Sequence, residues 1–280
     1  MKLTKVLQLI AFMLLFPIDA ICSTTELTIQ GDHGKLSAIL TSPDTANYPL
    51  VIFCHGFTSN KEFPIFEKIS DKLAKAGIAS LRFDFNGHGK SEGNFEDMTV
   101  INEISDVQKV IEYSLTLKDV SSISLAGHSQ GGVVAAMLAG EMGLENIRSL
   151  LLLAPAAVLR DDALRGIMFG KKYDPLNPPE FFELPFPEDN PLKIGREYIL
   201  TAQTLPIYET SRKYKGPLFL IHGTADTVVP YTYSQRFKYE LKNSELYLID
   251  GENHAFSVHT DAAINAAVKF LVKTLLEKNN

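Results

Sequence analysis

Several features that mark other protein classes are scarce in this chain. It has no tryptophan and only two cysteines in 280 residues, and no pair of histidines or cysteines has the spacing of a metal site. We therefore expect no metal. Its 27 Lys and Arg stand against 33 Asp and Glu, a net charge of −6, with no block of basic residues. This balance argues against a nucleic-acid partner and against an anionic membrane surface.

One glycine-rich stretch invites comparison with nucleotide-binding loops. Gly87-His-Gly-Lys-Ser91 has the composition of a phosphate loop, but Asp84 stands five residues before Gly89, where that loop requires a glycine. As a dinucleotide fingerprint, the stretch has Glu92 where the third glycine belongs. The sequence therefore predicts no nucleotide and no other cofactor.

The first 22 residues differ in kind from the rest. A short basic head, 1–5, precedes an apolar run, 6–18, and a segment that ends in Cys22. This layout is typical of a cleaved secretory signal, and the run is too short to be a comfortable membrane span. We expect cleavage near Ala20 or Cys22 and a secreted or periplasmic domain from 23 to 280. Lipidation of Cys22 is an alternative.

Strand-like and helix-like segments alternate over most of the remaining chain. This rhythm predicts an α/β fold with a mostly parallel sheet covered by helices on both faces. Expected strands cover 26–30, 35–42, 48–54, 78–85, 123–126, 147–154, 217–221 and 245–249, and expected helices cover 64–76, 100–117, 133–142, 233–241 and 262–276. Cys54 ends an apolar strand and is interpreted as a buried small residue.

The alternation fails between about 156 and 214. This segment is rich in proline and aromatic residues, which a poorly ordered surface insertion would leave uncovered. A compact domain seldom tolerates so long a structureless loop, so we expect an inserted cap over the carboxyl edge of the sheet. The residues concerned include Tyr173, Pro175, Pro178, Pro179, Phe181, Phe182, Pro185, Phe186 and Pro187.

A candidate nucleophile lies where the strand at 123–126 meets the following helix. Gly127-His-Ser129-Gln-Gly131 has the G-x-S-x-G pattern of a nucleophile elbow, in which a sharp turn makes the serine hydroxyl project outward. Gly127 and Gly131, two residues to either side of the serine, lack the Cβ atoms that would clash where helix and strand pack closely. An ordinary turn with a spare serine is the alternative, and the flanking strand and helix argue against it.

A serine hydroxyl needs a base within hydrogen-bond reach, and that base needs an acid to orient it. In the elbow fold these follow in the order serine, acid, histidine. His254 lies in a loop after the last strand, and Asp226 lies in a loop after the preceding strand. Singly, His254 could be a surface histidine and Asp226 a turn cap. Their order at three strand ends predicts a triad with Ser129.

The reaction of such a triad also needs donors for an oxyanion. The backbone N–H of Gln130, directly after the serine, is the first candidate. The loop His55-Gly-Phe57-Thr supplies the second, with the N–H of Phe57 as the best choice. The side chain of Gln130 is not required for this role and reads as a polar residue at a helix start.

Residues 48–255 resemble the α/β-hydrolase superfamily and, within it, the bacterial cinnamoyl and feruloyl esterases. The resemblance implies the triad Ser129, Asp226 and His254, and a cap that shapes a pocket for a hydroxycinnamoyl ring. It also makes Asp162 a candidate contact for the phenolic hydroxyl, although Asp162 could equally be a solvated acid. The matching stretches are Phe83-Asp-Phe-Asn-Gly-His-Gly-Lys-Ser-Glu-Gly93, Gly127-His-Ser-Gln-Gly-Gly-Val133, Leu153-Ala-Pro-Ala-Ala157, Leu205-Pro-Ile-Tyr-Glu209 and His222-Gly-Thr-Ala-Asp-Thr-Val-Val229.

This chain departs from the family pattern at Phe169, where relatives can carry a polar residue, and in having no tryptophan. We expect Phe169 to contact substrate. The resulting hypothesis is a serine carboxylesterase that hydrolyses feruloyl or cinnamoyl esters of plant cell-wall sugars, so its partner is a small-molecule or oligosaccharide ester. Alternatives are a general short-chain esterase or a serine peptidase on the same scaffold, or a non-catalytic protein that binds an aromatic ligand. A homodimer is compatible with the sequence.

Overall fold

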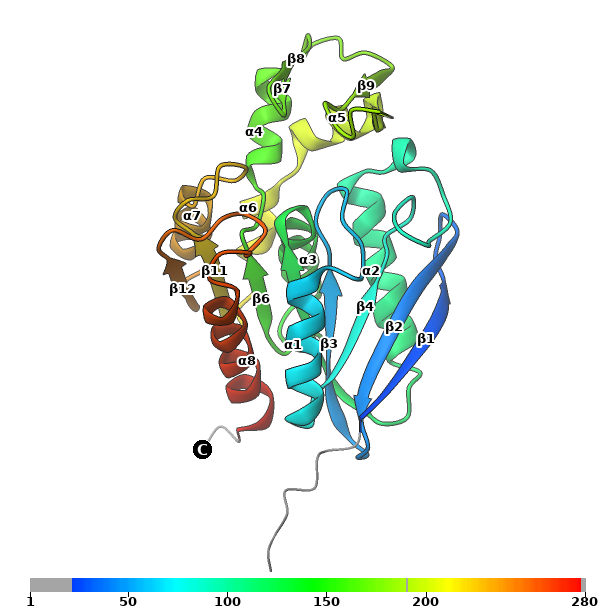
Figure 1. Cartoon of the computed structure of the whole chain (residues 1–280), viewed down its shortest axis with the longest axis vertical. Coiled ribbons are helices and arrows are strands. Elements are labelled where there is room, and N and C mark those ends of the chain that lie inside the picture. Colours follow the sequence, from blue (N-terminus) through cyan, green and yellow to red (C-terminus); the bar gives the residue numbers. More distant parts are fainter. Residues whose placement is uncertain (1–21, 190, 278–280) are drawn as a thin grey trace, which may run out of the picture.

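A computed structural model describes residues 22–189 and 191–277, in which one sheet carries helices on its two faces and a cap at one end (Figure 1). The expected signal segment lies outside the described residues, except that Cys22 begins the first strand. Within these residues, no helix combines the length and the apolar character that crossing a membrane requires.

The sheet has eight strands, and six of them form a continuous parallel set from β4 to β12. The hairpin of β1 and β2 adds at one side, with β2 antiparallel to β1 and to β4. The spatial order is β1 (Cys22–Gln30), β2 (Lys35–Pro43), β4 (Ala79–Phe83), β3 (Tyr48–Cys54), β5 (Val120–His128), β6 (Leu150–Leu153), β11 (Leu218–Gly223) and β12 (Ser244–Ile249).

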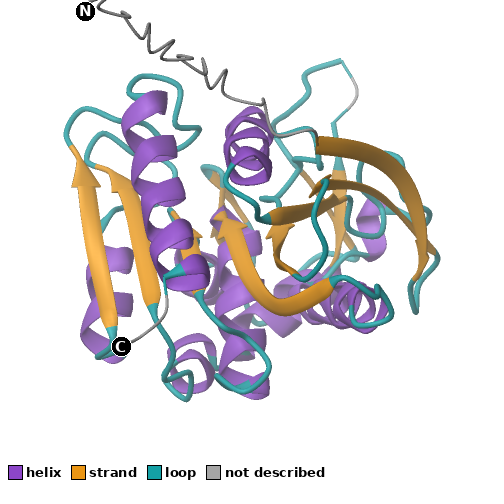
Figure 2. Cartoon of the chain, turned by 90° about the horizontal axis from the view of Figure 1, so that it is seen from below, coloured by secondary structure: helices purple, strands orange, loops and turns teal. Residues whose placement is uncertain are grey.

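Alternate side chains of the central strands enter two separate hydrophobic cores, because successive residues of a strand point to opposite faces. On β3, Val51 and Phe53 pack with helices α1 (Pro64–Lys75) and α8 (Thr260–Leu276). Leu50 and Ile52 pack instead with α2 (Val100–Ser114) and α3 (Ser129–Met142). A strand buried on both faces is apolar at every position, as β3 is, and Figure 2 shows helices on both sides of the sheet.

The segment between β6 and β11 forms the cap. Its two longer helices, α4 (Val158–Arg165) and α5 (Arg196–Thr204), pack on each other above the carboxyl ends of the strands (Figure 1). A short helix, α6 (Ile207–Ser211), leads back to the sheet and packs on α3. Between α4 and α5 lie two small hairpins, made of β7 (Ile167–Met168) with β8 (Lys171–Lys172) and β9 (Phe181–Glu183) with β10 (Lys193–Gly195).

The expected mostly parallel sheet with helices on both faces is confirmed, and so is the order of its elements. The main difference lies at the elbow, where α3 begins at Ser129 itself and not at Val133. Gly131 and Gly132 are poor helix formers, which is why propensity alone places the start too late. The remaining helix, α7 (Thr232–Glu240), packs on β11 and β12.

Candidate active site

Ser129 occupies the first position of α3, directly after β5, with a left-handed backbone (φ 55°). A non-glycine residue in this backbone region is strained, and the surrounding packing must hold it in that conformation. Two glycines permit that packing. A Cβ on Gly131 would lie 2.2 Å from the carbonyl oxygen of His55, and one on Gly127 would lie 2.2 Å from the carbonyl oxygen of Gly131. The pattern G-x-S-x-G is therefore a steric requirement of this turn.

Ser129, His254 and Asp226 form one hydrogen-bonded chain. His254 Nε2 lies 2.9 Å from Ser129 Oγ, and His254 Nδ1 lies 2.7 Å from Asp226 Oδ2. Asp226 follows β11, and His254 follows β12, so the chain spans loops at the carboxyl ends of parallel strands. The structure thus brings together all three residues that the sequence singled out. With the Nδ1 proton donated to Asp226, Nε2 faces the serine as an acceptor.

The carboxylate of Asp226 is held by further donors. Its Oδ1 accepts from the backbone N–H groups of Val228 and Val229 at 2.9 and 2.8 Å, and its Oδ2 is 3.1 Å from Nε2 of buried His222. Burial alone would raise the pKa of Asp226, but the hydrogen bonds from His222 and His254 outweigh it and hold that pKa below its ordinary value. Asp226 is therefore a fixed anion beside the imidazole of His254.

His128, just before Ser129, is a second histidine of the site that the sequence analysis did not single out. Its Nε2 donates to the carbonyl oxygen of His254 at 2.9 Å, and its ring lies 4.8 Å from that of His254. Burial, and then the charge of His254, lower the pKa of His128 to about 3, so it is neutral. His128 thus anchors the loop that carries His254.

The two candidate oxyanion donors lie beside Ser129. Gln130 is the second residue of α3, where the backbone N–H has no carbonyl partner one turn earlier in the helix. The loop with Phe57 approaches from β3, since a Cβ added to neighbouring Gly56 would lie 3.0 Å from Ser129 Cβ. Phe57, Ser129 and Gln130 line the same cavity.

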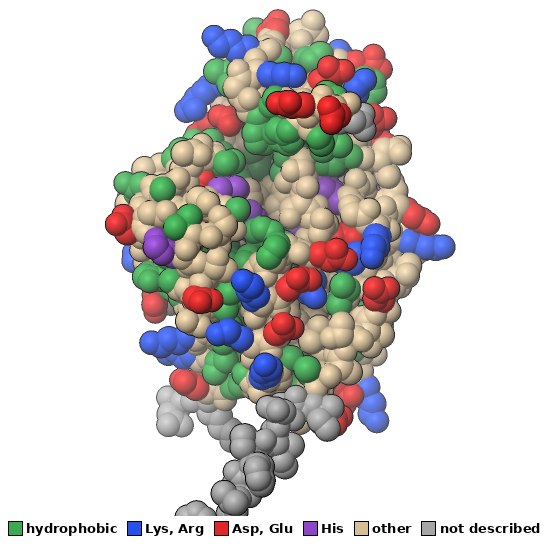
Figure 3. Space-filling model, in the orientation of Figure 1, with side chains coloured by type: hydrophobic (Ala, Val, Ile, Leu, Met, Phe, Trp, Pro, Cys, Tyr) green, Lys and Arg blue, Asp and Glu red, His purple; other side chains and the backbone are tan. Residues whose placement is uncertain are grey.

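This cavity, of about 360 Å³, lies between the sheet and the cap, and most of its lining is apolar. Figure 3 shows hydrophobic side chains gathered on the underside of the cap, above a hollow. Asp162 of α4 and Phe169 both line it. Burial raises the pKa of Asp162, although Arg165 opposes this. The ring of Phe169 stacks on that of Phe57, with 5.6 Å between centroids.

The side chain of Gln130 has a role that the sequence did not reveal. Its Oε1 accepts from Tyr198 Oη of the cap helix α5 at 2.7 Å, and its Nε2 donates to Glu103 Oε2 of α2 at 2.9 Å. All three side chains are buried. A glutamine at a helix start gives no signal of such long-range partners, because they come from positions 68 and 27 residues away.

Comparisons with known proteins agree with this geometry. The model of the family described as serine aminopeptidase, S33, matches residues 46–173, and the model of the TAP-like protein family matches 198–280. The solved structure of Est1E from Butyrivibrio proteoclasticus with bound ferulic acid is 33% identical, covers 89% of this chain and 98% of its own, and superposes with a TM-score of 0.84.

Two curated relatives are more distant. The AB hydrolase superfamily protein YisY of Bacillus subtilis is 24% identical over 78% of this chain and 89% of its own length. The mitochondrial palmitoyl-protein thioesterase ABHD10 of Bos taurus is 24% identical over 88% of this chain and 82% of its own. With the fold and the likeness to Est1E, these matches show that the chain belongs to the α/β-hydrolase superfamily and resembles its cinnamoyl and feruloyl esterases.

Proposed function

We propose that the protein is a serine carboxylesterase that hydrolyses hydroxycinnamate esters of plant cell-wall sugars through an acyl-enzyme. The observation that carries this proposal is the 2.9 Å contact between His254 Nε2 and Ser129 Oγ, at the floor of an apolar cavity under the cap. A serine without an acceptor at this distance would be a weak nucleophile at neutral pH.

The first half of the reaction forms the acyl-enzyme. Ser129 Oγ attacks the ester carbonyl carbon while its proton passes to His254 Nε2, and the carbonyl oxygen becomes an oxyanion. The N–H groups of Phe57 and Gln130 donate to this oxyanion. Asp226 stabilises the imidazolium and keeps its orientation. The tetrahedral intermediate then collapses, the bond to the sugar oxygen breaks, and His254 returns its proton to the leaving alcohol.

The second half releases the acid. Water attacks the acyl carbon and gives one proton to His254 Nε2, which passes it to Ser129 Oγ when the acyl–oxygen bond breaks. The products are the free hydroxycinnamic acid and the regenerated enzyme. Each step uses the same three side chains and the same two backbone donors, and therefore requires no cofactor.

Three features support an aromatic acyl group. The cavity walls present the rings of Phe57, Phe169 and Tyr198, which suit a flat aromatic ring. Asp162, half-buried at the same cavity, can accept a hydrogen bond from a phenolic hydroxyl. Ferulic acid is the ligand in the solved structure of Est1E. We propose Asp162 and Phe169 as substrate contacts on these grounds.

The match to the serine aminopeptidase family keeps a peptidase as the second candidate, and a short-chain esterase would use the same chemistry. A panel of methyl ferulate, methyl cinnamate, p-nitrophenyl acetate and an aminoacyl p-nitroanilide separates the three. We expect kcat/KM for methyl ferulate to exceed that for the acetate, and no turnover of the anilide. Turnover of the anilide alone would contradict the proposal.

We also propose that the first 22 residues direct export and that the mature enzyme is secreted or periplasmic. The support is the basic head and short apolar run of the sequence. N-terminal sequencing of protein recovered from its natural host would test this. A new N-terminus near residue 21 or 23 is expected, and an intact Met1 would contradict it.

A further inference from the structure

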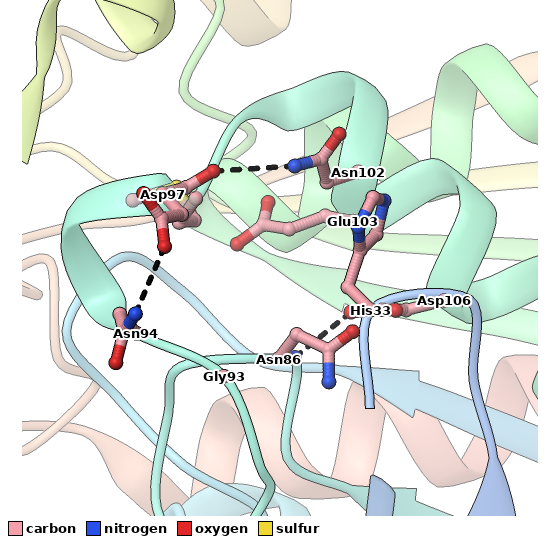
Figure 4. Close-up of a pocket in the computed structure, with 9 residues that line it drawn as sticks. His33, Asn86, Gly93, Asn94, Asp97, Asn102, Glu103 and Asp106 are labelled. Atoms are coloured by element: carbon pink, nitrogen blue, oxygen red, sulfur yellow. Dashed lines mark hydrogen bonds between the residues drawn. The ribbon is translucent and has the colours of Figure 1, made fainter. Parts of the chain in front are cut away.

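A second cavity, of about 250 Å³, lies apart from the cavity of Ser129, with no lining residue in common. Helix α2, the loop after β4, the 3-10 turn η1 (Phe95–Asp97) and the turn with His33 between β1 and β2 surround it (Figure 4). Polar and apolar atoms share its lining about equally, and the lining contains His33 but no Lys or Arg. Its carboxylates and amides belong to Asn86, Asn94, Asp97, Asn102, Glu103 and Asp106.

Three buried side chains in this lining each keep one oxygen without a partner among the described residues. The atoms are Glu103 Oε1, Asp106 Oδ1 and Asn86 Oδ1. Their other polar atoms are engaged: Glu103 Oε2 accepts from Gln130, Asp106 Oδ2 accepts from the N–H of Asn86 at 2.8 Å, and Asn86 Nδ2 donates to the carbonyl of Glu92 at 3.1 Å. The side chains are therefore fixed, and what remains on each is an acceptor.

Unpartnered buried acceptors are costly, about 1–3 kcal/mol each and more for charged groups. Two of these three belong to carboxyl groups one helical turn apart on α2. A positive charge among the three oxygens would satisfy them together, whereas a neutral acceptor ligand would not.

We propose that this cavity binds a small hard cation, Ca²⁺ in preference to Mg²⁺, through Glu103 Oε1, Asp106 Oδ1 and Asn86 Oδ1. Carboxylate and amide oxygens are the ligands that Ca²⁺ prefers, and its flexible coordination of six to eight oxygens suits a site completed by water. Mg²⁺ demands near-ideal octahedral geometry. Within the described residues no group of three His, Cys, Asp or Glu is placed to hold a metal ion, and the ligands named here are two carboxylates and one amide.

Cation binding at this site would affect the turn at Ser129, because Glu103 lines the second cavity and also accepts a hydrogen bond from Gln130. Glu103 Oε1 faces the second cavity, and its Oε2 holds the amide of Gln130, next to Ser129. A bound cation would fix the carboxylate of Glu103 in place, and with it the hydrogen bond from Gln130. The site itself stands independently of the esterase proposal, since its ligands do not line the cavity under the cap.

Isothermal titration of chelator-treated protein with CaCl₂ and with MgCl₂ tests the proposal. We expect one Ca²⁺ per chain with a Kd on the order of 10⁻⁴ M, weaker binding of Mg²⁺, and a rise in Tm on adding Ca²⁺. Glu103→Gln and Asp106→Asn should each weaken Ca²⁺ binding at least about tenfold. Glu112→Gln, on the same helix but exposed to solvent, should leave it unchanged.

Two results would overturn the inference. One is the absence of saturable Ca²⁺ binding by the wild-type chain up to about 10 mM, far above the expected range. The other is equal binding by the folded Asp106→Asn variant, which would assign the ion to surface carboxylates. Circular dichroism of each variant establishes that it is folded. Because the readout is binding, loss of esterase activity neither supports nor contradicts it.

Discussion

Tyr198 of the cap donates a 2.7 Å hydrogen bond to the side chain of Gln130, the residue that directly follows Ser129. The amide of Gln130 in turn donates to Glu103 at the start of α2. The cap is thus joined to the first turn of α3 by a buried polar chain. Because Tyr198 also lines the cavity, the position of one of its walls depends on this hydrogen bond.

Removal of the Tyr198 hydroxyl should selectively impair the hydrolysis of esters with an aromatic acyl group. Tyr198→Phe keeps the ring but leaves Gln130 Oε1 without its donor, a change of about 1–1.5 kcal/mol. We expect KM for methyl ferulate to rise about five- to tenfold while kcat for p-nitrophenyl acetate changes little. Tyr173→Phe is the matched control, since its hydroxyl makes only a 3.4 Å contact with Ala163. Equal effects on both substrates would assign a general structural role to Tyr198.

Asp226→Asn should abolish most of the turnover with little change in KM. The amide can donate to His254 Nδ1, which favours the tautomer that presents a proton, and not an acceptor, to Ser129. In another serine hydrolase the equivalent change lowers kcat by about 10⁴-fold. Steady-state kinetics on methyl ferulate measure this. A loss of less than about tenfold would show that Asp226 does not orient the base.

Asp162→Ala separates phenolic from non-phenolic acyl groups. A hydrogen bond from a phenol to a carboxylate contributes about 1.5–3 kcal/mol, so kcat/KM for methyl ferulate should fall roughly tenfold or more. Methyl 3,4-dimethoxycinnamate, which has no phenolic hydroxyl, should be unaffected by the substitution. A parallel fall for both esters would mean that Asp162 shapes the cap without contacting the hydroxyl.

We expect His128 to cause part of the loss of folding stability at low pH. Its pKa is lowered to about 3 in the native protein, against 6.5 for an ordinary histidine. Between pH 3 and 6.5 the unfolded chain therefore has this histidine protonated, whereas the native state has it neutral. As a result, the free energy of unfolding falls as the pH drops from 6.5 towards 3. His128→Gln should flatten that slope. Urea titrations across this range test it, and an unchanged slope would contradict the assignment.

The layers and the clustering of Ser129, Asp226 and His254 could be predicted from the sequence because both follow short local patterns. Strands such as β3 are apolar at every position, and Gly127 and Gly131 flank the serine for steric reasons that can be read from the motif. The order of Asp226 and His254 after strand ends then predicts where their side chains meet. Contacts of this kind depend only on topology, which the alternation of segments largely determines.

What remained hidden depends on packing between distant segments. His222 gives no signal in the sequence of its contact with Asp226, although its Nε2 lies 3.1 Å from Asp226 Oδ2. Gln130 was interpreted as a helix-start residue, although it bridges the cap and α2. The small hairpins of the cap also carry no period-2 signal, since β7 and β8 have only two residues each. Such features arise from tertiary contacts that no local pattern encodes.

Labelling by a fluorophosphonate, followed by intact-mass spectrometry and peptide mapping, tests the role of Ser129 most directly. The wild-type chain should gain one adduct, mapped to Ser129. Ser129→Ala should gain none, and His254→Ala should label far more slowly because the base is absent. An adduct of equal yield on Ser129→Ala, or a wild-type protein that stays unlabelled, would contradict the account.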